Sequence, residues 1–189
     1  MDDSRRIADP VLDFVVTGMN LAPGRLRDQL DDEPTLFVFL RHFGCIFCRE
    51  AIADIRAASE GEADFPRVLF FFRGSATEGR AFLRRYFPNA KAVADPTGEL
   101  YDAFGIQRGG LAKNLGPKVW RARKRAAGKG HRNGARSGDI WRLPGVMLTR
   151  GERIYWVHDV KHAADHPDLE EVSRINRVLA EGGPRPEGS

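Results

Sequence analysis

The chain lacks several features that would assign it to a broad class of protein. No apolar run approaches the roughly 18 residues that a membrane-spanning helix needs, and the start lacks the apolar core of a signal peptide. The glycine fingerprints of phosphate-binding and dinucleotide-binding loops are also missing, so no cofactor is expected. With 42% hydrophobic and 30% charged residues, these absences predict one globular domain over residues 1–189 that works in the cytoplasm.

Cysteine is scarce, and its two copies form a single motif. Cys45 and Cys48 make a C-x-x-C pair after the apolar run Leu36–Leu40. A cysteine in the first turn of a helix faces unpaired backbone N–H groups and the positive end of the helix dipole, and both favour the thiolate. Arg41 and Arg49 add positive charge on either side. The spacing lets one sulfur attack the other, which predicts a reversible redox pair.

Other uses of the two cysteines are weaker but stay open. A closed zinc site needs four ligands, and the chain has no second C-x-x-C. Only His42, or the distant His158, His162 and His166, would be left to complete such a site, so no metal is expected. A structural disulfide would close a very short loop and remove little chain entropy. Two buried, inert thiols are the remaining alternative.

Strand-like and helix-like patterns alternate along the chain. The predicted strands cover residues 11–16, 36–40, 68–72, 90–94, 146–148 and 153–157, and the predicted helices cover 24–30, 45–59, 77–86, 99–104 and 169–179. This order is typical of an α/β protein of thioredoxin-like fold, with a mixed central sheet flanked by helices. Pro144 lies just before the last hairpin, where thioredoxin-like folds carry a cis-proline that faces the C-x-x-C.

Two segments carry a resemblance to a known family. Phe39–Glu50 contains the C-x-x-C, and Asp95–Gly105 reads D-P-T-G-x-L-x-x-x-F-G. Both are similar to the alkyl hydroperoxide reductase/thiol-specific antioxidant (AhpC/TSA) family, and specifically to its peroxiredoxin-like subgroup with C-x-x-C. The resemblance extends over Val11–Leu179. It implies a thiol oxidoreductase that reduces hydroperoxides through a dithiol–disulfide cycle.

The roles of individual residues depend on how the chain departs from that family. A typical peroxiredoxin reads P-x-x-x-T-x-x-C, whereas this chain has Arg41 in place of the proline and Cys45 in place of the peroxide-orienting threonine. As a peroxidase of that pattern, it would attack with Cys48 and resolve with Cys45, and the Asp95–Gly105 segment favours this branch. As a thioredoxin-like reductase, it would attack with Cys45 and release with Cys48.

The resemblance also implies groups that assist the thiols. A cation is needed to hold the thiolate and polarise the peroxide, and Arg142 is the candidate that the fold brings nearest, with Arg41 as the local one. His42 is a candidate proton donor or acceptor near neutral pH. The alternative for each is an ordinary surface or packing role.

Substrates and partners follow from the same resemblance. We expect a small hydroperoxide or a disulfide as substrate and a thioredoxin- or glutathione-type reductant, with a homodimer contact as a further option. The alternatives are a thioredoxin-like protein disulfide reductase, or a non-enzymatic interaction protein that uses the basic insertion.

A basic insertion is predicted at residues 108–136. This stretch contains ten lysines and arginines and no acid, although the whole chain has a net charge of only +4. Apolar residues recur in it at helical spacing: Leu111, Leu115, Val119, Ala122 and Ala126. The helix could bind an anionic surface, guide an acidic substrate or reductase partner, or pack on the domain as a lid. We expect neither nucleic acid nor membrane as partner, because aromatics are sparse beyond Trp120 and no binding module is recognised.

Overall fold

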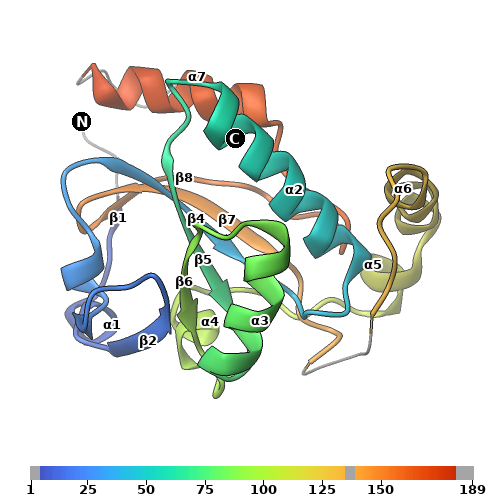
Figure 1. Cartoon of the computed structure of the whole chain (residues 1–189), viewed down its shortest axis with the longest axis horizontal. Coiled ribbons are helices and arrows are strands. Elements are labelled where there is room, and N and C mark those ends of the chain that lie inside the picture. Colours follow the sequence, from blue (N-terminus) through green and yellow to red (C-terminus); the bar gives the residue numbers. More distant parts are fainter. Residues whose placement is uncertain (1–4, 135–138, 182–189) are drawn as a thin grey trace.

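The protein is built on a mixed sheet with helices on both faces (Figure 1). It is described here by a computed structural model that covers residues 5–134 and 139–181. The strands lie in the order β1-β8-β7-β4-β5-β6-β2-β3. Their bounds are β1 Arg5–Arg6, β2 Val15–Met19, β3 Gly24–Arg25, β4 Pro34–Phe39, β5 Arg67–Phe72, β6 Lys91–Ala94, β7 Gly145–Arg150 and β8 Arg153–Val157. The helices are α1 Asp9–Leu12, α2 Ile46–Gly61, α3 Ala76–Tyr86, α4 Glu99–Ala103, α5 Leu111–Leu115, α6 Pro117–Gly128 and α7 Leu169–Ala180, with a 3₁₀ turn at Arg27–Gln29.

Strand β4 occupies the centre of the sheet. It pairs in parallel with β5 and antiparallel with β7, and β6 continues the parallel part beyond β5. Helices α2 and α3 make the crossovers that parallel pairing requires. Every residue of β4 is buried, which confirms the sequence prediction of a strand covered on both faces.

Alternate residues of β4 enter two separate cores. Leu36 and Val38 pack with the apolar faces of α2 and α7 on one side of the sheet. Phe37 and Phe39 pack with α1 and α4 on the other side, and the ring of Phe39 stacks on Phe71 with 4.3 Å between centroids. Because successive side chains of a strand point to opposite faces, this one strand joins both cores.

The prediction was wrong at the N-terminal edge of the sheet. The predicted strand over 11–16 is replaced by the short helix α1, and the strand begins only at Val15. Pro10 explains the difference, because proline is favoured in the first turn of a helix. The predicted helix over 24–30 is a two-residue strand followed by a 3₁₀ turn.

Helix α3 begins at Ala76, one residue before the predicted start at 77. Its cap is Ser75, and Ser75 and Glu78 form a reciprocal capping box in which each side chain accepts from the other's backbone N–H. Within the described part of the chain, no helix is long and apolar enough to cross a bilayer.

The predicted basic insertion contains two helices rather than one. Gly116 separates α5 from α6, which begins at Pro117. In α6, Val119, Ala122 and Ala126 are buried in the same core as α2, so this part of the predicted apolar stripe packs on the body of the protein, whereas Leu111 on α5 is exposed. Figure 1 shows α6 beside the N-terminal end of α2, away from the sheet.

We expect Tyr101→Phe to lower the free energy of unfolding by about 1–2 kcal/mol. The buried Tyr101 hydroxyl lies 2.5 Å from the carbonyl oxygen of Leu40 and 2.8 Å from that of Phe71, so it ties together the ends of β4 and β5. Urea unfolding measures the change. Tyr155→Phe is the control, because that hydroxyl makes no hydrogen bond to a described residue. Equal midpoints for the two variants would contradict the prediction.

Candidate active site

The two cysteines lie where the central strand passes into α2. The chain leaves β4 after Phe39, and Cys45 is the N-cap residue of α2, with Cys48 in the first helical turn. Both are free thiols, and their exposed fractions are 3% and 1%. The motif therefore occupies the start of a helix, as the sequence predicts, but both sulfurs are buried.

The surroundings of the two sulfurs shift the pKa values of the two thiols in opposite directions. A hydrogen bond from the Cys48 thiol lowers the pKa of Cys45 to about 6, and the nearby Arg41 guanidinium and the backbone N–H groups of Phe47 and Cys48 act in the same direction against burial. The pKa of Cys48 is raised well above its ordinary value, because this thiol donates to Cys45 and is buried. Within the reduced pair, the thiolate form is therefore favoured at Cys45 over Cys48.

Arg41 is the cation that accompanies the thiols. Its Nη1 lies 3.4 Å from the sulfur of Cys45, and its backbone N–H donates to the sulfur of Cys48 over 3.3 Å. The rest of the guanidinium donates to the side-chain oxygen of Asn114 and the carbonyl oxygens of Ile140 and Arg142, at 2.7–2.8 Å. These oxygens fix a buried guanidinium against the motif.

The main chain of Arg142 takes part in this network, but its guanidinium binds other groups. Its Nη2 donates to Asp102 over 2.6 Å, and its Nη1 donates to the carbonyl oxygen of Ile106 over 2.6 Å. Only its main-chain carbonyl takes part, as an acceptor for Arg41. The structure therefore brings Arg41, and not the side chain of Arg142, to the thiols.

His42 contacts the C-x-x-C motif through its main chain. Its carbonyl oxygen accepts a hydrogen bond from the backbone N–H of Cys45 over 3.0 Å. Its backbone N–H acts on the Cys48 sulfur, where it opposes the rise in the pKa of that thiol. A role of the imidazole as proton donor or acceptor stays a prediction.

Pro144 reaches the same neighbourhood from the start of β7. The Leu143–Pro144 peptide bond is trans, so the cis geometry that thioredoxin-like folds carry here is absent from this bond. Pro144 and Cys48 both line a cavity of about 250 Å³ between α2, α6 and the segment before α7.

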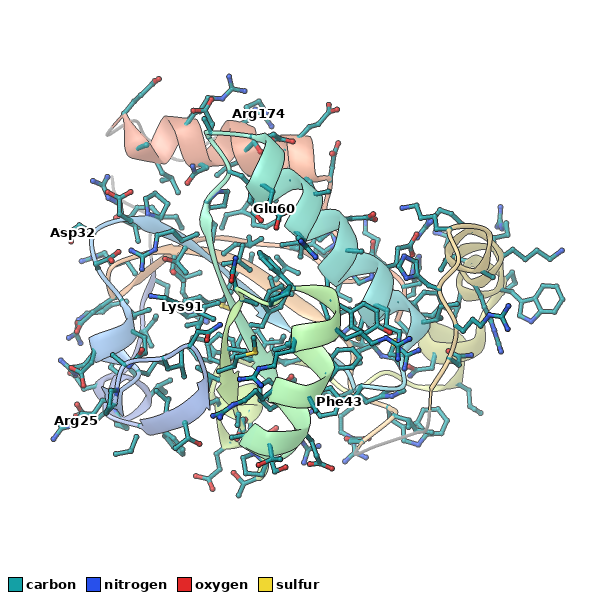
Figure 2. All side chains as sticks on the ribbon, in the orientation of Figure 1. Arg25, Asp32, Phe43, Glu60, Lys91 and Arg174 are labelled. Atoms are coloured by element: carbon teal, nitrogen blue, oxygen red, sulfur yellow. The ribbon has the colours of Figure 1, made fainter. Side chains whose placement is uncertain are left out.

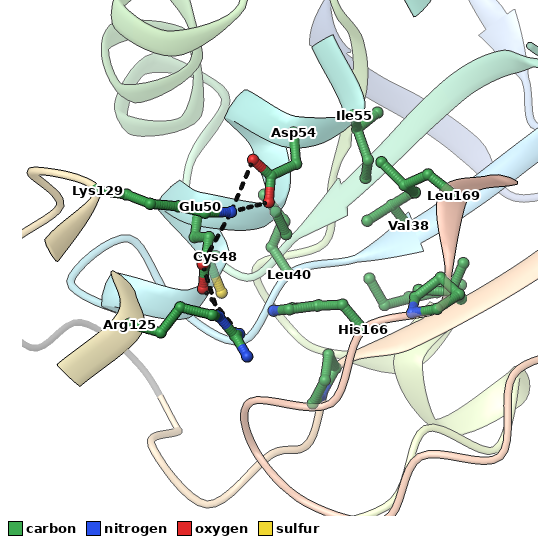
Figure 3. Close-up of a pocket in the computed structure, with 15 residues that line it drawn as sticks. Val38, Leu40, Cys48, Glu50, Asp54, Ile55, Arg125, Lys129, His166 and Leu169 are labelled. Carbon is green, nitrogen blue, oxygen red and sulfur yellow. Dashed lines mark hydrogen bonds and ion pairs between the residues drawn. The ribbon is translucent and has the colours of Figure 1, made fainter. Parts of the chain in front are cut away.

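Charged residues from α2 and α6 close one side of this cavity (Figure 3). Burial alone would raise the pKa of Glu50, but hydrogen bonds from Arg125 and Lys129 outweigh burial and lower it. Arg125 donates to both carboxylate oxygens, at 3.0 and 3.2 Å, and Lys129 also pairs with Asp54 at 2.9 Å. These ion pairs fasten the insertion to the helix that carries the thiols.

His166 lies on the opposite wall of the cavity from α6 (Figure 3). Burial lowers its pKa to about 4, so its imidazole is neutral at physiological pH. His158, His162 and His166 all fall between β8 and α7 rather than on a helix, and the described residues include no cluster of three or more potential metal ligands.

A short segment after α6 covers the N-terminus of α2. We call residues Arg132–Gly134 the strap. The Asn133 side chain accepts from the backbone N–H of Ile46 over 3.3 Å, and Gly134 donates to the carbonyl oxygen of Gly44 over 3.1 Å. Arg49 donates to the carbonyl oxygen of Arg132 over 2.6 Å. The insertion therefore forms part of the wall around the thiols.

Several of these residues were not predicted as site residues. Asn114, Glu50 and Arg125 join the site through contacts between segments far apart in the chain. One signal did exist. A stretch with ten cations and no acid needs carboxylates from elsewhere in the chain, and Glu50 and Asp54 lie two and six residues beyond Cys48 on α2.

Comparisons with known proteins show the family and the fold of the chain. The family described as AhpC/TSA antioxidant enzyme matches residues 57–162, more than half of the chain. Thioredoxin-like protein AAED1, chloroplastic, from Arabidopsis thaliana is 22% identical over 158 residues, which cover 78% of this chain. The chain spans 63% of the length of that relative.

Two solved structures share the architecture. The bacterioferritin comigratory protein of Xanthomonas campestris, whose description refers to alkyl peroxide reduction, gives a TM-score of 0.66 at 12% identity, with 95% of this chain and 99% of that chain covered. Peroxidoxin BcpB of Mycobacterium tuberculosis gives 0.60 at 15% identity, with 95% and 98% covered. These likenesses concern the fold, and they confirm the thioredoxin-like α/β class predicted from the sequence.

Arg41→Gln should raise the pKa of Cys45, because it removes the positive charge beside that sulfur. The thiolate should then disappear at a higher pH as the solution is acidified, and the reaction of Cys45 with an alkylating agent should slow several-fold near pH 6. A titration of thiolate ultraviolet absorbance in Cys48→Ser, with and without the Arg41 change, measures the shift. Arg41→Lys keeps the positive charge, so the pKa of Cys45 should lie between those of the form that retains Arg41 and the Arg41→Gln form. Identical titrations of Cys48→Ser with arginine, glutamine or lysine at position 41 would refute the role of Arg41.

Proposed function

Since the chain belongs to the AhpC/TSA antioxidant enzyme family, we propose that it is a thiol-dependent peroxidase that cycles Cys45 and Cys48 between dithiol and disulfide. The observation that carries this proposal is the unequal thiol pair. One sulfur is stabilised as thiolate by Arg41 and the start of α2, and the other is held as thiol within hydrogen-bonding reach.

The first step belongs to Cys45. Its thiolate attacks the terminal peroxide oxygen, so that an S–O bond forms and the O–O bond breaks. The alkoxide leaves and takes a proton to become an alcohol. Cys45 is oxidised to a sulfenic acid and the peroxide is reduced. Arg41 supplies the positive charge that stabilises both the thiolate and the developing negative charge on oxygen.

Cys48 completes the cycle. Its sulfur attacks the sulfenic sulfur, an S–S bond forms, and the hydroxyl leaves with the Cys48 proton as water. A dithiol or two small thiols then return the disulfide to the reduced pair. This order is the reverse of the typical peroxiredoxin pattern, in which the residue in the position of Cys48 attacks.

The cellular setting follows from the chemistry of the cycle. The substrate is a hydroperoxide, and the reductant is a thioredoxin- or glutathione-type thiol. A cycle that depends on thiols operates in a reducing compartment, for which we propose the cytoplasm.

A thioredoxin-like protein disulfide reductase is the second candidate. Cys45 stands in the position of the threonine that orients peroxide in typical peroxiredoxins, so the motif offers no hydroxyl for that purpose. The same thiolate would attack a substrate disulfide instead, and Cys48 would release the reduced product.

Peroxide consumption by the cysteine variants separates these functions. With dithiothreitol as reductant, wild type should consume hydroperoxide, and Cys45→Ser should form no sulfenic acid and lose turnover. Cys48→Ser should form one sulfenic acid per chain, because attack by Cys45 does not need Cys48 as nucleophile. Mass spectrometry with a sulfenic-acid trap measures the product.

Two outcomes would change the assignment. If Cys45→Ser still forms the sulfenic acid and Cys48→Ser does not, the roles of the cysteines are reversed. If wild type consumes no peroxide but reduces a protein disulfide in a Cys45-dependent way, the second candidate is correct.

A further inference from the structure

The cations of α6 and of its C-cap residue Lys129 fall into two groups with different surroundings. Arg125 and Lys129 lie toward α2 and are paired with Glu50 and Asp54. The outer group comprises Lys118, Arg121, Arg123 and Lys124, all exposed, and none of them forms an ion pair with a described residue. The acids of α2 therefore neutralise only the inner edge of the helix.

An exposed tryptophan lies among the outer cations. Trp120 has an exposed fraction of 64%, and its ring contacts the ammonium group of Lys124, 5.2 Å from the ring centroid. Leu111, on the neighbouring helix α5, is 68% exposed. We call Leu111, Lys118, Trp120, Arg121, Arg123 and Lys124 the outer face of the insertion. Figure 2 shows side chains that project from α6 on the side away from the sheet.

The outer face belongs to the same element that encloses Cys45. Asn114 of α5 holds Arg41 against the Cys45 sulfur, and the strap beyond α6 lies over the N-terminus of α2. Cys45 has an exposed fraction of only 3%. A macromolecule that docks on the insertion would therefore lie beside the segments that enclose Cys45.

We propose, on the basis of the proposed function, that the outer face of the insertion is the docking surface for an acidic protein dithiol that reduces the Cys45–Cys48 disulfide. Trp120 is the apolar anchor of this surface, and the four outer cations attract carboxylates around it. Exposed tryptophan and arginine are the residues most enriched among energetically dominant interface positions. Unpaired like charges speed the encounter with a partner of opposite sign.

The size of the surface favours a protein over a small thiol. Helix α6 has 12 residues, which corresponds to a length of about 18 Å. A tripeptide thiol would contact only a part of this length. Nucleic acid is disfavoured because a single exposed tryptophan offers only one position for base stacking.

The reaction on this surface is an exchange of two electrons. One thiolate of the partner attacks the Cys45 sulfur, a mixed disulfide forms, and Cys48 leaves and takes a proton. The second thiol of the partner then attacks its own sulfur in the mixed disulfide and releases Cys45. The partner dithiol is oxidised to a disulfide while this chain is reduced.

The test compares a protein reductant with a small one. Peroxide turnover is measured with an acidic thioredoxin, kept reduced by thioredoxin reductase and NADPH, and separately with dithiothreitol. For Arg121→Glu/Lys124→Glu, the KM for thioredoxin should rise at least about tenfold. Trp120→Ala should raise it several-fold. The dependence of this KM on salt, present in wild type, should be weaker in the charge-reversed protein.

The control is Arg84→Glu/Arg85→Glu, which makes the same change of charge at two exposed positions near the end of α3. Its KM for thioredoxin should stay near that of wild type. The proposal is overturned if both double variants change KM equally or if neither changes it. It is also overturned if a single-stranded oligonucleotide binds wild type and not Arg121→Glu/Lys124→Glu while KM stays unchanged.

The dithiothreitol assay keeps this inference separate from the proposed function. If wild type consumes no peroxide with dithiothreitol, the peroxidase function fails. If it consumes peroxide with dithiothreitol and all variants have the same KM for thioredoxin, the function stands and the docking surface is wrong.

Discussion

A thiolate buried at Cys45 needs a positive charge close to its sulfur, and the other contacts of the site hold that charge in place. The Cys45 sulfur has almost no contact with solvent, and burial disfavours its charged form. Arg41 compensates for this cost, but a guanidinium is itself costly to bury unless its N–H groups are satisfied. Asn114 and the carbonyl oxygens of Ile140 and Arg142 satisfy them. The thiolate therefore depends on α5 and on the segment before β7, although neither contains a reacting atom.

The insertion has two faces with different tasks. Its inner face provides apolar contacts and the ion pairs to Glu50 and Asp54, and these hold α6 against the helix that begins at the cysteines. Its outer face leaves four cations and Trp120 in solvent. The insertion thus shapes the environment of the thiols and presents a charged surface next to them. The insertion can therefore contribute both to the environment of the thiols and to the binding of the reductant.

The sequence predicted those parts of the fold that are determined locally. The buried strand β4, the helix after C-x-x-C, the last hairpin and α7 follow from periodicity, and the structure confirms them. Contacts between segments far apart in the chain were harder to predict. The sequence favours Arg142 as the nearest cation and Arg41 as the local one, whereas in the structure Arg142 pairs with Asp102 and Arg41 contacts Cys45. Likewise, the apolar pattern after Pro10 predicted a strand, but proline favours the first turn of a helix, and the structure has the short helix α1 there.

The family resemblance and the local physics give different answers for the attacking sulfur. Alignment with the typical motif favours Cys48, because that position carries the peroxide-attacking cysteine. Both cysteines are buried, and the hydrogen bond to Cys45 together with burial raises the pKa of Cys48. Cys45 caps the start of α2, where the backbone N–H groups of Phe47 and Cys48 face its sulfur, and it also has Arg41 nearby. When threonine is replaced by cysteine at this position, the position with the best stabilisation for an anion itself becomes a thiol, which is why we propose Cys45 as the attacking residue.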